Sequence, residues 1–139
     1  MAEKGLPEAF TCFTLNLDNL SELTKRFGYT VGDGVLKDFA GLVQLMGDTE
    51  GMRGYNGIGR FVVFFEECSS KKAAAMIRIL DNQVEEYNSL NPEYPIRYTA
   101  AWATTEETDT YEIRELLRLS QKKWKQMEKE KKDKTEEET

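Results

Sequence analysis

The chain has 139 residues, of which 40% are hydrophobic, a size and composition that suit one compact domain with a single core. Its 25 acidic residues outnumber its 19 basic ones, and the formal net charge of −6 argues against a dedicated nucleic-acid-binding protein, which would need a basic surface. The chain has no histidine, which removes the commonest general base and the commonest transition-metal ligand.

Nothing in the sequence resembles a targeting segment. No apolar run approaches the roughly 20 residues needed to cross a bilayer, and the N-terminus lacks the apolar stretch of a secretory signal. We therefore expect a cytoplasmic protein without a membrane segment. Cys12 and Cys68 are expected as reduced thiols, although the sequence alone leaves a disulfide between them open.

The first half of the chain predicts one strand and two helices. Residues 10–17 carry apolar or β-prone side chains on both alternating faces, as in an interior strand that is covered on both sides. Asp18 and Asn19 follow as good N-cap residues for a short helix that ends at Gly28, with Glu22 completing a capping box. A second helix is expected from Thr30 to about residue 46, on an apolar repeat of about four.

A hairpin and a third helix come next. Residues 53–55 and 60–66 predict the two arms of the hairpin, which residues 56–59 close with two glycines. Ser69 or Ser70 is expected to cap a helix, which Asn91-Pro92 ends.

The last elements complete the fold prediction. Residues 96–104 predict a strand, and a final helix is expected from about Thr110 to Met127, where its apolar stripe fades. Trp102 and Trp124 are expected in or beside the core. The order β-α-α-β-β-α-β-α predicts an α/β (α+β) sandwich, with a mixed sheet flanked by helices.

The domain boundaries follow from these elements. We expect an N-terminal extension over residues 1–9, one domain over residues 10–130 and a flexible charged tail over residues 131–139. The sequence leaves open whether the chain is an excerpt of a longer sensor protein, and which input domain or partner would belong to it.

The most informative motif is the turn that enters the second hairpin arm. It reads Gly57-Ile58-Gly59-Arg60-Phe61. The two glycines suit a turn that needs positive φ, and they would equally let a phosphate approach backbone N–H groups. Arg60 suits either a solvated hairpin tip or a contact with an acidic partner surface or a phosphate.

Residues 16–36 resemble, in register and without a gap, the first signature of the GGDEF (diguanylate cyclase) family. That signature runs Asp-x-Asp-x-Phe-Lys-x-Ile-Asn-Asp-x-x-Gly-His-x-x-Gly-Asp-x-Val-Leu. The agreeing positions are Asp18, Gly28, Gly32, Asp33, Val35 and Leu36. The turn at residues 57–61 is similar to the family's Gly-Gly-Asp/Glu-Glu-Phe hairpin, and residues 116–124 are similar to a worn form of its final helix. The resemblance covers roughly residues 10–130.

The resemblance implies the GGDEF, nucleotidyl-cyclase-like fold and a known chemistry. Active family members pair two GTP-loaded domains to make cyclic di-GMP with magnesium. Phosphoryl transfer on a triphosphate needs cations to neutralise charge, and magnesium prefers carboxylate ligands.

The family's acidic positions are substituted in this chain. The first metal aspartate falls on Asn16, the metal and catalytic acid of the hairpin falls on Gly59, and the next acid falls on Arg60. Since each such group is worth about 10²–10³-fold in rate, we expect no cyclase activity, no catalytic residue and no metal site. Asp18 could still be a metal ligand, although capping of the following helix explains it as well.

The nucleotide positions are only partly kept. The guanine-reading asparagine falls on Thr24, whereas the guanine-reading aspartate survives as Asp33, which would also suit the start of a helix. The phosphate-binding lysine of the last helix falls near Met127, and the family's histidine is Tyr29. The Arg-x-x-Asp of the product-inhibition site falls on residues 48–51, which lack the arginine, so binding of cyclic di-GMP there is not expected.

Three hypotheses for function follow. The first is a degenerate bacterial GGDEF domain that serves as a signalling or protein-interaction module, with a protein partner or a second copy and no cofactor. The second is a sensor that binds GTP weakly, with magnesium but without turnover, through Asp33, Thr24 and the backbone of Asn19-Leu20-Ser21. The third, an active cyclase with relocated ligands such as Glu66 or Glu67, is disfavoured because a strand of that length separates them from the turn by about 15 Å.

Overall fold

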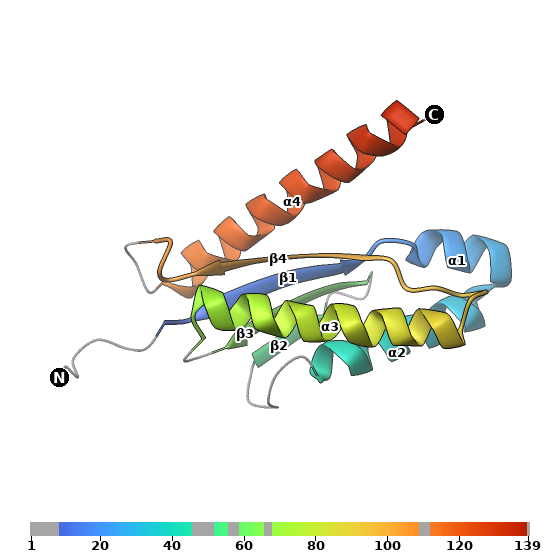
Figure 1. Cartoon of the computed structure of the whole chain (residues 1–139), viewed down its shortest axis with the longest axis horizontal. Helices are drawn as coiled ribbons and strands as arrows, with labels where there is room; N and C mark the ends of the chain where they lie inside the picture. The colour runs from blue at the N-terminus through green and yellow to red at the C-terminus, as the bar shows by residue number, and fades with distance from the viewer. Residues whose placement is uncertain (1–8, 46–51, 56–58, 66–67, 109–111, 139) are drawn as a thin grey trace.

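A computed structural model of the chain describes residues 9–45, 52–55, 59–65, 68–108 and 112–138, and for residues 52–55 and 132–138 it describes the backbone alone. Four strands and four helices follow one another in the expected order (Figure 1). They are β1 Thr11–Leu17, α1 Leu20–Phe27, α2 Tyr29–Gln44, β2 Met52–Tyr55, β3 Arg60–Phe65, α3 Ser70–Leu90, β4 Tyr98–Thr104 and α4 Ile113–Glu138.

The α+β fold class is confirmed, but the sheet is not mixed. Its strand order is β2-β3-β1-β4, and every pairing between these described strands is antiparallel. The connection from β1 to β2 passes over β3, and the connection from β3 to β4 passes over β1. Strands that run the same way are therefore never neighbours, and the helices between them do not create a parallel pair.

The main core lies between one face of the sheet and helices α2 and α3. Alternate residues of the strands point to this face, among them Phe13, Leu15 and Val63, which are 0%, 0% and 1% exposed. The stripes of α2 and α3 meet them through Phe39 and Leu80. This packing confirms the apolar periodicity predicted for both helices.

Helix α4 covers the opposite face, over β1 and β4 (Figure 1). A polar contact fixes it there, because the Ser120 hydroxyl lies 2.8 Å from Thr14 Oγ1 and 3.4 Å from Cys12 Sγ, all in buried positions. Burial raises the pKa of the Cys12 thiol to about 11. Cys12 and Cys68 are both free and buried, so neither forms the disulfide that the sequence left open.

The start of α3 agrees with the prediction from the sequence, and the end of α4 differs from it. Ser69 caps α3 as expected, since its Oγ accepts a hydrogen bond from the Lys72 backbone N–H at 3.2 Å. Helix α4, however, continues to Glu138, whereas the sequence predicted a flexible tail from residue 131. The tail consists mainly of lysine and glutamate, which are good helix formers and stand at i,i+4 spacing in several places.

Candidate functional site

The candidate site lies where β1 ends and β3, the second arm of the hairpin, begins. The register of the sheet places Asn16 opposite Arg60 of β3 on one side and opposite Thr99 of β4 on the other. Since residues of one parity share a face, these three side chains lie in a row beneath α4. The fold thus brings the three substituted acidic positions, Asn16, Gly59 and Arg60, together where β1 ends and β3 begins.

At the first of these positions, the Asn16 side chain forms a hydrogen bond with another side chain of the protein. Asn16 Nδ2 donates a hydrogen bond to Asp18 Oδ1 at 2.8 Å. The other carboxylate oxygen, Asp18 Oδ2, accepts from Thr99 Oγ1 at 2.5 Å and lies 3.5 Å from Lys131 Nζ. Helix α1 shows no side-chain cap, so the expected capping by Asp18 is wrong. Partners on β4 and α4, distant in the sequence, take its carboxylate instead.

The second position, Gly59, has a backbone that an acidic residue would not adopt readily. Its φ is +90°, in the region that favours glycine, which confirms the positive φ expected of the turn. Its carbonyl accepts a hydrogen bond from the Leu17 N–H at 2.8 Å. A Cβ at this position would lie 3.3 Å from Leu20 Cδ2 and 3.5 Å from Leu17 Cβ. Gly57 and Ile58 lie outside the described residues.

Arg60, at the third acidic position, is not a solvated hairpin tip. Its guanidinium carbon lies 4.2 Å above the ring of Trp124, and its Nε is buried. The expected exposure is wrong because α4 crosses directly over this end of β3. Phe61 turns to the other face, is 7% exposed and packs edge to face on Phe39. Trp124 is 8% exposed, as the sequence predicted for a core position.

We call Asn16, Asp18, Thr99, Glu128 and Lys131 the polar cluster. Lys131 Nζ donates to Thr99 Oγ1 at 2.6 Å and to the Tyr98 carbonyl at 2.9 Å, so an ammonium group already neutralises Asp18. Burial raises the pKa of Glu128, and a hydrogen bond with Asp18 raises it further. Glu128 and Lys131 were not predicted from the sequence, because the apolar stripe of α4 ends at Met127. Their spacing of four and seven from Trp124 was the available signal.

The residues predicted to bind a nucleotide are partly committed elsewhere. The Asn19 amide donates to the Pro95 carbonyl at 2.7 Å and accepts from the Arg97 N–H at 3.2 Å, so both ends of this buried side chain bind the segment before β4. The capping box predicted at Asn19 is therefore wrong. Leu20 packs against the core and Ser21 is exposed.

Thr24 and Asp33 lie on the paired helices α1 and α2. Thr24 Oγ1 donates to the Leu20 carbonyl at 2.9 Å, and it lies so close to Gly32 that a Cβ there would clash with it. Asp33 is half-buried and pairs with Lys37 at 3.1 Å, one turn along α2. Since α2 begins at Tyr29, Asp33 stands in its second turn and does not cap it.

The described part of the chain shows no group of three or more His, Cys, Asp or Glu side chains that could hold a metal ion. Residues 48–51, Glu66 and Glu67, which earlier hypotheses involve, lie outside the described residues. Among the helices that the structure does describe, none is long and apolar enough to span a bilayer.

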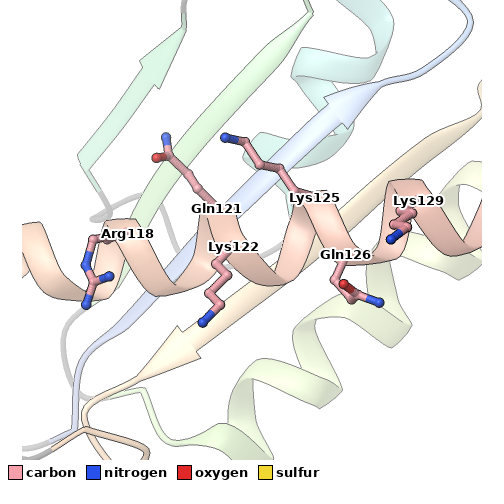
Figure 2. Close-up of a pocket in the computed structure, with 6 residues that line it drawn as sticks. All are labelled: Arg118, Gln121, Lys122, Lys125, Gln126 and Lys129. Carbon is pink, nitrogen blue, oxygen red and sulfur yellow. The ribbon is translucent and has the colours of Figure 1, made fainter.

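A shallow hollow lies on the surface of α4 (Figure 2). Its lining comes from this one helix and is mostly cationic: Arg118, Gln121, Lys122, Lys125, Gln126 and Lys129. Only Arg118 of its four cations has an ion pair among the residues described, with Glu115 at 2.8 Å. The hollow is an open helix surface and does not enclose a nucleotide.

A family model described as "Diguanylate cyclase, GGDEF domain" matches residues 2–134. No curated protein sequence matches the chain. Several solved structures share its fold. The active GGEEF domain of a diguanylate cyclase from Vibrio cholerae is 19% identical, with a TM-score of 0.78 over 88% of this chain and 78% of that one. An EAL/GGDEF domain protein from M. capsulatus is 14% identical, with a TM-score of 0.71 over 88% and 80%. The GGDEF domain of DgcB from Caulobacter crescentus, solved with c-di-GMP, is 16% identical, with a TM-score of 0.61 over 74% and 63%.

Proposed function

The chain belongs to the GGDEF domain family of diguanylate cyclases, and from that premise we propose that it is a non-catalytic member, which serves as a protein-interaction module in cyclic di-GMP-type signalling. The observation that carries the proposal is the pair of substituted positions at the end of β1 and the hairpin. Asn16 is neutral and bonded to Asp18, and Gly59 has no side chain and a positive φ that disfavours any other residue.

Magnesium bound to a triphosphate requires oxygen ligands, most often carboxylates. The one carboxylate beside Asn16 is that of Asp18, which accepts hydrogen bonds from Asn16 and Thr99 and faces the Lys131 ammonium. An incoming dication would have to displace that ammonium and would meet Arg60 at the hairpin. Both features oppose cation binding through like-charge repulsion.

The second candidate function is a GTP sensor without turnover. Its best-supported ligand contact is Asp33, at the family's guanine-reading position. Two of its other contacts are weakened, because the Asn19 amide is bonded at both ends and Thr24 faces Gly32 in the helix pair. This candidate would use magnesium together with GTP, whereas the interaction module needs no cofactor.

Calorimetric titration with GTP, with and without magnesium, tests the choice. The proposal predicts no binding heat in either titration. Magnesium-dependent binding would contradict it. GTP binding that Asp33→Asn abolishes and that Glu85→Gln, at an exposed acid of α3, retains would establish the sensor instead.

The interaction module needs a surface, and the outer face of α4 is the strongest candidate (Figure 2). Arg118, Lys122, Lys125 and Lys129 stand at i, i+4, i+7 and i+11, so like charges are neighbours along one stripe. Such repulsion weakens a helix slightly unless an acidic surface neutralises it. The stripe carries no aromatic side chain for base stacking and no apolar side chain for membrane insertion, so we assign it to an acidic protein surface.

Charge reversal tests this surface with the host protein that co-purifies with the domain. Lys122→Glu/Lys125→Glu/Lys129→Glu should abolish co-purification of an acidic partner. A control variant with the same change in net charge, Lys25→Glu/Lys71→Glu/Arg78→Glu, alters exposed cations on helices α1 and α3 and should retain the partner. Equal loss in both variants, or no loss in either, would remove the surface from the account.

A further inference from the structure

Strand β4 forms one edge of the sheet, and its register shows which backbone groups face outward. The Thr105 N–H donates to the Phe10 carbonyl at 3.1 Å, and the Asp18 N–H donates to the Arg97 carbonyl at 2.8 Å. Residues 97 and 105 therefore direct their backbone groups toward β1. Because this direction alternates along an antiparallel strand, residues 98, 100, 102 and 104 direct theirs away from the sheet.

Side chains that follow β4 in the sequence occupy three of these eight outward N–H and C=O groups. Lys131 Nζ donates to the Tyr98 carbonyl at 2.9 Å, and Lys123 Nζ donates to the Trp102 carbonyl at 3.0 Å. The Thr104 N–H donates to Glu107 Oε2 at 2.8 Å. Ala100, midway between the two lysine contacts, receives no such cap from any described residue. Helix α4 thus supplies a lysine to the edge strand on either side of Ala100.

Both lysines are held in place by contacts within the domain. Lys123 forms an ion pair with Glu107, and Lys131 lies 2.6 Å from Thr99 Oγ1 and 3.5 Å from Asp18 Oδ2. Neither is a freely rotating surface lysine. Their ammonium groups stay over the edge as long as α4 lies on the sheet.

Without these two lysines, the sequence of β4 would favour pairing with a strand of another chain. Residues 98–104 read Tyr-Thr-Ala-Ala-Trp-Ala-Thr, with no charge and no proline. An uncharged edge strand with aromatic and β-branched residues is a template for pairing with another chain. Charged lysines are a common protection of such edges.

We infer that Lys123 and Lys131 keep the edge of β4 from pairing with the β4 edge of a second copy of this chain. The two capped carbonyls lie symmetrically about Ala100. An antiparallel β4–β4 pair centred on Ala100 would place Tyr98 of one copy opposite Trp102 of the other, which satisfies a two-fold axis. The inference is independent of the proposed function, since it concerns the free edge and not the hairpin.

Sedimentation velocity over a range of protein concentrations tests the inference. Lys123→Met/Lys131→Met keeps the long apolar stems and removes both ammonium groups, so this variant should self-associate where the wild-type protein does not. Lys122→Met/Lys129→Met makes the same change in charge on the outer face of α4 and should behave as the wild-type protein. Should loss of Lys131 unfold the domain through Asp18, the same pair of substitutions is made in an Asp18→Asn background.

Amide hydrogen exchange at Ala100 identifies the surface that pairs. Its N–H points outward, so exchange should be fast in the wild-type protein and at least ~tenfold slower in the associated variant. Ala100→Pro removes that N–H without removing a bond to β1, and adding it should return the variant to monomers. Unchanged sedimentation with fast exchange at Ala100, or association that survives Ala100→Pro, would overturn the inference.

Discussion

Position 59 has a backbone conformation that opposes the return of an acidic side chain. A side chain there must adopt φ near +90° and approach Leu20 to 3.3 Å. We predict that Gly59→Ala destabilises the domain by about 1–2 kcal/mol, the usual cost of a left-handed backbone for an L-residue. Urea denaturation measures the change. Gly41→Ala, in the open on α2, is the control and should stabilise the helix by about 0.5–1 kcal/mol.

The same position predicts the outcome of rescue. Gly59→Glu combined with Asn16→Asp should give a less stable protein that still makes no cyclic di-GMP from GTP. Product chromatography and the urea midpoint report the two effects separately. Cyclase activity in this variant would show that the hairpin backbone accepts an acid despite the positive φ at position 59.

Glu128 gives the polar cluster a pH dependence. Its pKa in the folded protein is raised above the ordinary 4.5, so folding favours the protonated carboxyl. Its contribution to stability is full below the unfolded value and is lost as pH rises through the folded value. We predict that Glu128→Gln, which cannot ionise, gains stability relative to the wild-type protein as pH rises above about 4.5. Unfolding free energies of both proteins from pH 4 to 8 test this, and a constant difference would contradict it.

For single residues, the sequence predicted local roles, such as a turn glycine or a helix cap, better than it predicted hydrogen-bond partners that are distant in the chain. It identified Gly59 as a turn glycine and Ser69 as a cap, because both roles are local. Asn19 binds backbone groups 76 and 78 residues away, and Asp18 binds Thr99 81 residues away. Such partners depend on strand register, which the local pattern does not contain.

Among the elements, β3 and α4 are joined by a cation–π contact. It is made by Arg60, which stands where the family has an acid. Arg60 lies over Trp124 at 4.2 Å, so Arg60→Met should lower stability by about 0.5–2 kcal/mol. A double-mutant cycle with Trp124→Leu isolates the pairwise energy. Arg26→Met is the control, since Arg26 lies 5.3 Å from an exposed ring and should change stability less. Equal effects at the two arginines would count against a buried stack.

The elements themselves were the most predictable part of the chain. Apolar periodicity located all four helices, and alternation with turn residues located the strands. The exception is the end of α4, where lysine and glutamate form a helix with no apolar stripe to reveal it. Lys131 lies in this polar part of α4. Its contacts with Thr99 and Asp18 could therefore not be predicted from the apolar pattern.

For the molecule as a whole, the order of elements predicted the α+β class but not the sense of the sheet. Alternating strands and helices suggested some parallel neighbours, whereas both crossovers skip a strand and leave every described pairing antiparallel. The candidate site depends on this arrangement, because it places the ends of β1, β3 and β4 in one row beneath α4. A resemblance over residues 16–36 predicted the candidate site, and the sheet register explains why Asn16 lies between Arg60 and Thr99 there.

Incubation of the purified chain with GTP and magnesium, followed by chromatography of the nucleotides, tests the central claim most directly. The account predicts that GTP is recovered unchanged, with no cyclic di-GMP at any protein concentration that allows two domains to meet. Cyclic di-GMP that forms only in the presence of the divalent ion would contradict it, since the chain would then hold a cation beside Asn16 and Gly59, where the proposal expects none.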